Sequence, residues 1–161
     1  MTNLVVCIKT ILSITLLLFA SQGLSKTMIV VEDAWIPMAP PTMTMNAGYF
    51  TLVNHGHHQQ TLVSASSPYY KHIEFHTSDM IDGMVSMQKI EQVAIGSHKA
   101  VHFKPGGLHL MMHAPVKPPV AGQTIPVSLV FASGVTQEIE LAVKKRQPKM
   151  NMHGQGHSHH H

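Results

Sequence analysis

Cysteine is almost absent from this chain, with one residue, Cys7, in 161. Charged residues are also sparse, at 12%, whereas hydrophobic residues make up 44%. This balance excludes the class of highly charged disordered proteins. No basic stripe interleaved with aromatic residues runs through the body, so we expect no nucleic-acid partner. Sustained helical periodicity is lacking too, and 11 glycines and 10 prolines argue against long helices.

An apolar run near the N-terminus, residues 11–20, follows Lys9 and precedes small and polar residues. This layout is typical of a secretory signal peptide, and the run is shorter than the ~20 residues of a membrane span. We therefore expect residues 1–25 to be a signal peptide, with an uncleaved anchor as the alternative. The mature protein would then be periplasmic, without stable membrane insertion. Because Cys7 lies inside this segment, the mature chain would have no disulfide and no thiolate metal site.

Short segments rich in apolar and β-branched residues alternate with turn residues from Thr27 onward. They predict nine strands, at residues 27–31, 47–53, 60–66, 70–76, 84–90, 99–103, 108–112, 124–131 and 136–143. Many short strands separated by turns indicate one all-β domain, a sandwich or a barrel, over residues 26–143. Residues 144–161 have no apolar pattern, so we expect a disordered tail that is first basic and then rich in His and Met.

Histidine and methionine, by contrast, are abundant, with 14 and 12 residues. Imidazole and thioether groups both bind metals, and thioethers favour soft Cu(I). Methionine also fills irregular cores, and histidine also occurs in solvated loops and purification tags. Composition alone does not choose between these roles, so the positions of the residues have to decide.

Asp82-Gly83 is a strong signal for a two-residue hairpin turn. Such a turn places Ser78 opposite Met87, and it makes His76 and Met87 diagonal neighbours on one face of the hairpin. Two side chains at that distance can reach one metal ion. A loop of odd length would shift the register and separate them, so this prediction depends on the turn.

His109 and Met111 alternate on another predicted strand, so their side chains point to the same side. The preceding residues 104–108 form a Pro-Gly-Gly turn that could swing this pair toward the hairpin. Together with His76 and Met87 they would supply two imidazoles and two thioethers. This neutral donor set suits one Cu(I) ion, whereas Zn²⁺ would prefer thiolate, imidazole or carboxylate ligands.

Three further methionines lie close to these segments in the sequence. Met80 and Met84 flank the turn, either as auxiliary ligands or as an exposed methionine-rich rim. Met112 follows Met111 directly, and we expect it to be an ordinary packing residue.

The spacing of the four candidate ligands resembles the signature of the PCuAC family of periplasmic copper chaperones. His76 and Met87 are separated by ten residues, and twenty-one residues then precede His109-Leu110-Met111. The resemblance extends over roughly residues 28–143. It implies a cupredoxin-like or immunoglobulin-like Greek-key β-sandwich that binds Cu(I) through two His and two Met. It also implies delivery of copper to the CuA centre in cytochrome c oxidase subunit II, alongside Sco-type thioredoxin-fold proteins.

The end of the chain is a second candidate copper site. Five histidines occur in the last nine residues, interrupted by Gly and Ser, and some PCuAC proteins carry a similar tail. A purification tag is the alternative origin. Because imidazole clusters suit Cu(II), the tail resembles a weaker Cu(II)-capturing site. Its candidate ligands are Met150, Met152, His153, His157, His159, His160 and His161.

We interpret these patterns as a monomeric Cu(I) carrier and not as an enzyme. The main alternative is a periplasmic copper buffer that sequesters copper without a dedicated recipient. A blue-copper redox protein would need a cysteine ligand, which the mature chain lacks. A copper oxidase would need a substrate-lined open site, for which the sequence gives no sign. An adhesive sandwich with incidental His and Met residues would not explain the matched spacing.

Overall fold

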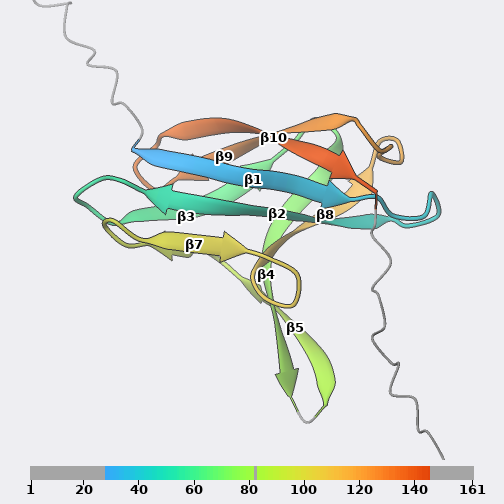
Figure 1. Ribbon diagram of the computed structural model, residues 1–161, viewed down its shortest axis with the longest axis horizontal. Helices are drawn as coiled ribbons and strands as arrows, with labels where there is room; N and C mark the ends of the chain where they lie inside the picture. The colour runs from blue at the N-terminus through green and yellow to red at the C-terminus, as the bar shows by residue number, and fades with distance from the viewer. Residues whose placement is uncertain (1–27, 82, 146–161) are drawn as a thin grey trace, which may run out of the picture.

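A computed structural model describes residues 28–81 and 83–145, and every regular element in these ranges is a β-strand (Figure 1). The predicted all-β class is therefore confirmed. None of the described residues belongs to a helix that is long and apolar enough to cross a membrane. The ten strands are β1 (Ile29–Pro37), β2 (Met45–Asn54), β3 (Gln60–Ser66), β4 (Tyr70–Ile81), β5 (Met84–Ile90), β6 (Val93–Ile95), β7 (Ala100–Phe103), β8 (His109–Pro115), β9 (Thr124–Phe131) and β10 (Thr136–Lys144).

The strands form one mixed sheet in the order β5-β4-β8-β2-β1-β10-β9-β3-β6, with β7 paired to β2. Strand β2 joins the half formed by β5, β4 and β8 to the half that begins with β1, because its residues 45–48 pair with β8 and its residues 49–54 pair with β1. Large twisted sheets curl, and this one folds over so that β3 packs against β4 around a common core. The result is the sandwich architecture that the sequence predicted. The β4–β5 hairpin projects away from this body (Figure 1).

Alternation of side chains builds the core from both halves of the sheet. Strands β2 and β9 alternate between buried and partly exposed positions along almost their whole length. Phe50 of β2 stacks on Phe103 of β7, with ring centroids 4.2 Å apart. Leu110 and Met112 of β8 are fully buried, so Met112 is the packing residue that the sequence predicted. Because these residues face the core, the intervening residues of β8 face the opposite side.

The largest differences from the sequence prediction are in three strands. Strand β6 was missed, because three residues are too few to show a periodic pattern. Strand β4 continues to Ile81, well beyond the predicted end at His76, and forms the long arm of the projecting hairpin. Strand β1 continues to Pro37 through a shift of register next to Asp33, which has a φ of 51°. An irregularity of this kind leaves no periodic signal in the sequence.

Candidate metal centre

The hairpin of β4 and β5 has the register that the Asp-Gly turn predicted. Ser78 pairs with Met87, and Gly83 has a φ of 79°, a left-handed conformation that glycine adopts without strain. His76 and Met87 are therefore diagonal neighbours on one face of the hairpin. The first pair of predicted copper ligands is brought together by this turn.

Strand β8 lies along the other edge of β4 and brings the second pair to the same face. His76 pairs directly with His109, and the centroids of the two imidazole rings are 6.0 Å apart. Met111 pairs with Glu74, which makes Met111 a diagonal neighbour of His76. The four predicted ligands thus lie on one face of three adjacent strands, on the side of the sheet opposite the core.

The turn between β7 and β8 orients the ring of His109. The carbonyl oxygen of Gly107 accepts a hydrogen bond from the backbone N–H of Ser78 at 3.2 Å, and another from Nδ1 of His109 at 2.9 Å. A carbonyl oxygen can only accept, so Nδ1 of His109 carries the proton and Nε2 keeps its lone pair. His109 is only 4% exposed, so its imidazole is the more buried of the two histidine ligands predicted for the site.

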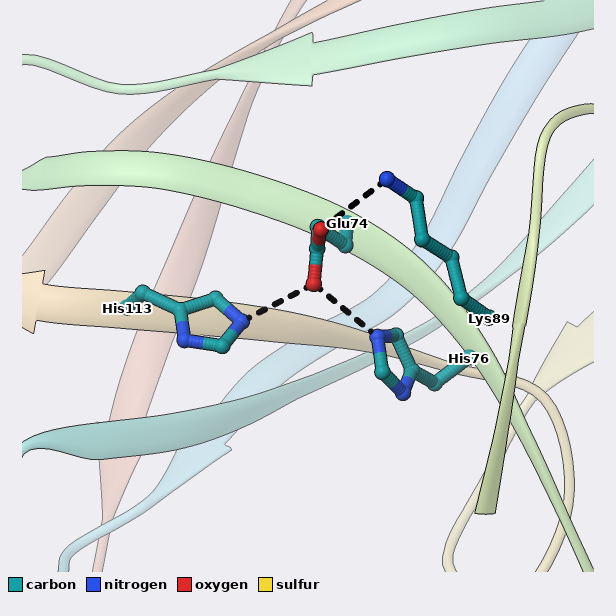
Figure 2. Close-up of polar contacts among 4 residues, drawn as sticks. All are labelled: Glu74, His76, Lys89 and His113. Atoms are coloured by element: carbon teal, nitrogen blue, oxygen red, sulfur yellow. Dashed lines mark hydrogen bonds and ion pairs between the residues drawn. The ribbon is translucent and has the colours of Figure 1, made fainter.

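Glu74 lies between three hydrogen-bond donors (Figure 2). Its Oε2 accepts from Nε2 of His76 and from Nε2 of His113, each at 3.1 Å, and its Oε1 pairs with Nζ of Lys89 at 3.0 Å. The hydrogen bond from Lys89, and after it the one from His76, lowers the pKa of Glu74 from 4.5 to about 2. Glu74 is therefore a carboxylate at neutral pH, and it raises the pKa of Lys89 in return.

The carboxylate of Glu74 determines which nitrogen of His76 is free to bind a metal. Because an ionised carboxylate only accepts, Nε2 of His76 carries a proton, and in the neutral imidazole Nδ1 then has the lone pair. That Nδ1 is buried, and it has no hydrogen-bond partner among the described residues. Buried polar atoms are almost always paired. A free imidazole nitrogen whose opposite N–H is held by a carboxylate is the usual arrangement of a metal-binding histidine.

The methionines of the projecting hairpin are more exposed than the histidines. Met87 is 56% exposed, whereas the side chain of His76 is 16% exposed. Met80 is exposed on the same face as His76 and Met87. Met84 is equally exposed, but the alternation along β5 directs it to the other face, so the structure does not bring it to the predicted ligands.

Two predictions fall on parts of the chain that the structure does not describe. The expected signal peptide, residues 1–25, and the candidate Cu(II) ligands between residues 150 and 161 lie outside the described residues.

Sequence reasoning missed the polar residues that surround the predicted ligands. It gave no role to His72, Glu74 or His113. The available signal was alternation: β4 reads His72-x-Glu74-x-His76, and β8 begins His109-x-Met111-x-His113. Residues at this spacing share a face, so each strand carries a row of three metal-binding side chains.

Comparison with known proteins gives a family and several related folds. The family model described as "Putative lipoprotein LpqE-like" matches residues 29–143. The "Putative lipoprotein Lxx21020" of Leifsonia xyli subsp. xyli is 30% identical over 117 residues, which cover 72% of this chain and 69% of the relative.

Among solved structures, the copper-bound PCuAC domain from PmoF2 has a TM-score of 0.63 at 21% identity, over 74% of this chain and 94% of that one. Cu(I)-bound DR1885 from Deinococcus radiodurans has a TM-score of 0.58 at 24% identity, over 78% and 83% of the two chains. These likenesses establish a shared fold, and they agree with the sandwich that the sequence predicted.

Proposed function

We propose that this chain, which belongs to the LpqE-like family and resembles PCuAC domains, is a periplasmic Cu(I) carrier. One Cu(I) ion would be bound by His76, Met87, His109 and Met111. The observation that carries this proposal is the buried, unpaired Nδ1 of His76, which lies on the strand position directly opposite His109.

The donor set explains why Cu(I) is the proposed cargo. Two imidazoles and two thioethers are neutral, and soft sulfur ligands favour Cu(I) over harder ions. The nearest anion is Glu74, which accepts a hydrogen bond from His76 and does not itself occupy a ligand position. A carboxylate in this place orients the imidazole and increases its basicity, and its charge stabilises a bound cation.

A gradient of exposure across the site suits the transfer of copper to a partner. His109 is 4% exposed and Met87 is 56% exposed, on a hairpin that projects from the body (Figure 1). An incoming ligand from a partner protein therefore meets Met87 first and His109 last. Exchange of neutral ligands needs no deprotonation, so copper can pass through intermediates in which both proteins hold it.

We propose that the recipient is the CuA site of cytochrome c oxidase subunit II or a Sco-type thioredoxin-fold protein, as the resemblance to PCuAC proteins implies. Export through residues 1–25 would place the carrier in the periplasm. The description of its family as lipoproteins supports an exported protein. The histidines of the tail would capture Cu(II) separately. On this proposal the protein acts as a monomer and catalyses no reaction.

An anaerobic Cu(I) titration against a chromophoric chelator tests the site. The full chain is used with its five tail histidines replaced by Asn, so that the tail contributes no imidazole. We expect one tight equivalent, which Met111→Leu weakens by at least about tenfold. Met112→Leu is the matched control, because it changes the next residue of the same strand with little change of volume in the core. Absence of tight Cu(I) binding, or equal behaviour of the two variants, would refute the proposed site.

A transfer experiment separates a carrier from a copper buffer. The Cu(I)-loaded chain is mixed with the soluble, metal-free CuA domain of subunit II, or with a Sco-type protein. A carrier transfers copper faster than it releases copper to a small chelator of equal affinity. Equal rates would indicate a buffer without a dedicated recipient.

A further inference from the structure

Strands β4 and β8 present three consecutive pairs of metal-binding side chains on one face. His76 pairs with His109, Glu74 pairs with Met111, and His72 pairs with His113. The two His–His pairs therefore lie on either side of a mixed Glu–Met pair. The proposed Cu(I) site uses the first His–His pair with Met87 and Met111. It leaves the second His–His pair without a role, and it uses Glu74 only as the hydrogen-bond acceptor of His76.

His72, Glu74 and His113 lie close enough to bind one ion together. Each of them offers one ligand atom, and these three atoms lie within 4.8 Å of one another. Nε2 of His113 is 3.1 Å from Oε2 of Glu74. The rings of His72 and His113 are stacked, with centroids 4.2 Å apart and an angle of 12° between their planes. Stacked rings cannot both point at one ion, so binding requires one of them to turn.

His72 is the residue that is free to turn. Its side chain is exposed, and it makes no hydrogen bond to any residue that the structure describes. Rotation of an exposed ring costs little, since it breaks only the stacking contact. His113 and Glu74 already face each other, and an ion between them would take the place of the proton that they share (Figure 2).

Two imidazoles and a carboxylate are nitrogen and oxygen donors, unlike the thioether-containing set one pair away. Such donors suit divalent ions of intermediate hardness, and Cu²⁺ binds them most strongly in the first-row series. A glutamate side chain is ordinarily ionised at neutral pH, so binding needs no deprotonation of the carboxyl group. Lys89 is paired with Oε1, so Oε2 would be the ligand atom: the ion would replace its hydrogen bond from His113, and the hydrogen bond from His76 would remain.

We propose that His72, Glu74 and His113 form a second metal site, which binds Cu(II) beside the Cu(I) site. The strand spacing places the two ions about 7 Å apart, because neighbouring pairs on one face are two residues apart along each strand. Glu74 serves both sites, as a ligand of Cu(II) and as the hydrogen-bond acceptor that orients His76. The folded domain therefore accepts either oxidation state of copper, each at its own pair of histidines.

Cu(II) binding to the metal-free full chain, with its five tail histidines replaced by Asn, tests this site. Electron paramagnetic resonance reports the nitrogen ligands, and competition with a chelator reports the affinity. We expect one Cu(II) with two imidazole ligands, and we expect His72→Gln and His113→Gln each to weaken it by at least about tenfold. The Cu(I) affinity of His72→Gln should equal that of its parent, which also shows that the variant is folded.

Two control variants decide where any Cu(II) binds. His76→Gln removes the other His–His pair. His57→Gln removes a loop histidine whose Nδ1 lies 3.2 Å from Nε2 of His98, a rival imidazole pair. Loss of the Cu(II) signal in either control, with His72→Gln unchanged, would overturn the proposal. Absence of Cu(II) binding in the parent would overturn it too, without affecting the Cu(I) titration that tests the carrier.

Discussion

The two His–His pairs of β4 and β8 have the same side chains on the same strands, but they have different surroundings. The pair of His76 and His109 is mostly buried, and Met87 of β5 is a diagonal neighbour of His76. The pair of His72 and His113 is more exposed and is stacked, and its diagonal neighbour on β4 is Glu74. On the two proposals above, burial and the additional ligands direct identical imidazoles toward different ions, so the number of histidines alone does not indicate which metal binds.

The carboxylate of Glu74 couples the two pairs. Its Oε2 accepts hydrogen bonds from both His76 and His113, one histidine from each pair. A change at this residue should therefore affect both sites, whereas a change in either pair should affect one. The predictions below test this difference, in order of decreasing effect.

The largest effect is expected from removing the most buried imidazole. His109→Asn should lower the Cu(I) affinity by more than about 100-fold, since it removes a ligand and not only the support of one. Binding of Cu(II) to the other pair should be retained. Anaerobic chelator competition measures the first quantity and electron paramagnetic resonance the second. If both affinities fell together, the two pairs would form one site, and the comparison above would be wrong.

Glu74→Gln should have the next largest effect and should affect both pairs. Loss of the carboxylate that orients His76 should weaken Cu(I) by about 10- to 100-fold. The same substitution removes a proposed ligand of Cu(II). Glu140→Gln is a matched control, because it makes the same change at an exposed position on β10. The same two affinity measurements apply, and a normal Cu(I) affinity in Glu74→Gln would show that His76 needs no support.

The low pKa of Glu74 predicts a pH-dependent stability of the metal-free protein. Its pKa is about 2 in the folded chain and 4.5 ordinarily, so ionised Glu74 stabilises the fold above pH 4.5. This contribution should be lost progressively as the pH falls from 4.5 toward 2. Urea unfolding of the wild type and of Glu74→Gln measures it as a difference in the free energy of unfolding. A difference that stayed constant over this range would contradict the assigned contacts.

The smallest effect is expected at the exposed end of the Cu(I) site. Met87→Leu should weaken Cu(I) by about tenfold, less than the change at His109, because Met87 is the outermost ligand. It should also accelerate the release of copper to a chelator, which stopped-flow absorbance can follow. Met84→Leu, on the other face of the hairpin, is the control and should leave both quantities unchanged. An effect of Met84→Leu equal to that of Met87→Leu would restore Met84 as an auxiliary ligand.

Much of the fold could be predicted from local signals. Alternating apolar residues located nine of the ten strands, and the Asp82-Gly83 turn predicted the pairing of Ser78 with Met87. Such signals are reliable because side chains alternate strictly along a strand and a two-residue turn permits one register. The third strand of the site could not be derived in this way. The Pro-Gly-Gly turn at residues 104–108 allowed His109 and Met111 to approach the hairpin but did not require it, and the spacing shared with PCuAC proteins made this association specific.

The sequence by itself determined the strands, the hairpin and the four residues proposed to bind Cu(I). The tertiary structure decided that β8 pairs with β4, which sets His76 against His109 and His72 against His113. It also decided that Glu74 accepts a hydrogen bond from His76 on one side and from His113 on the other, which leaves Nδ1 of His76 unpaired among the described residues. The physical reason is that alternation and turn geometry act between near neighbours in the chain. The burial and hydrogen bonding of an imidazole depend on strands far apart in sequence, so they arise only when the sheet has closed around its core.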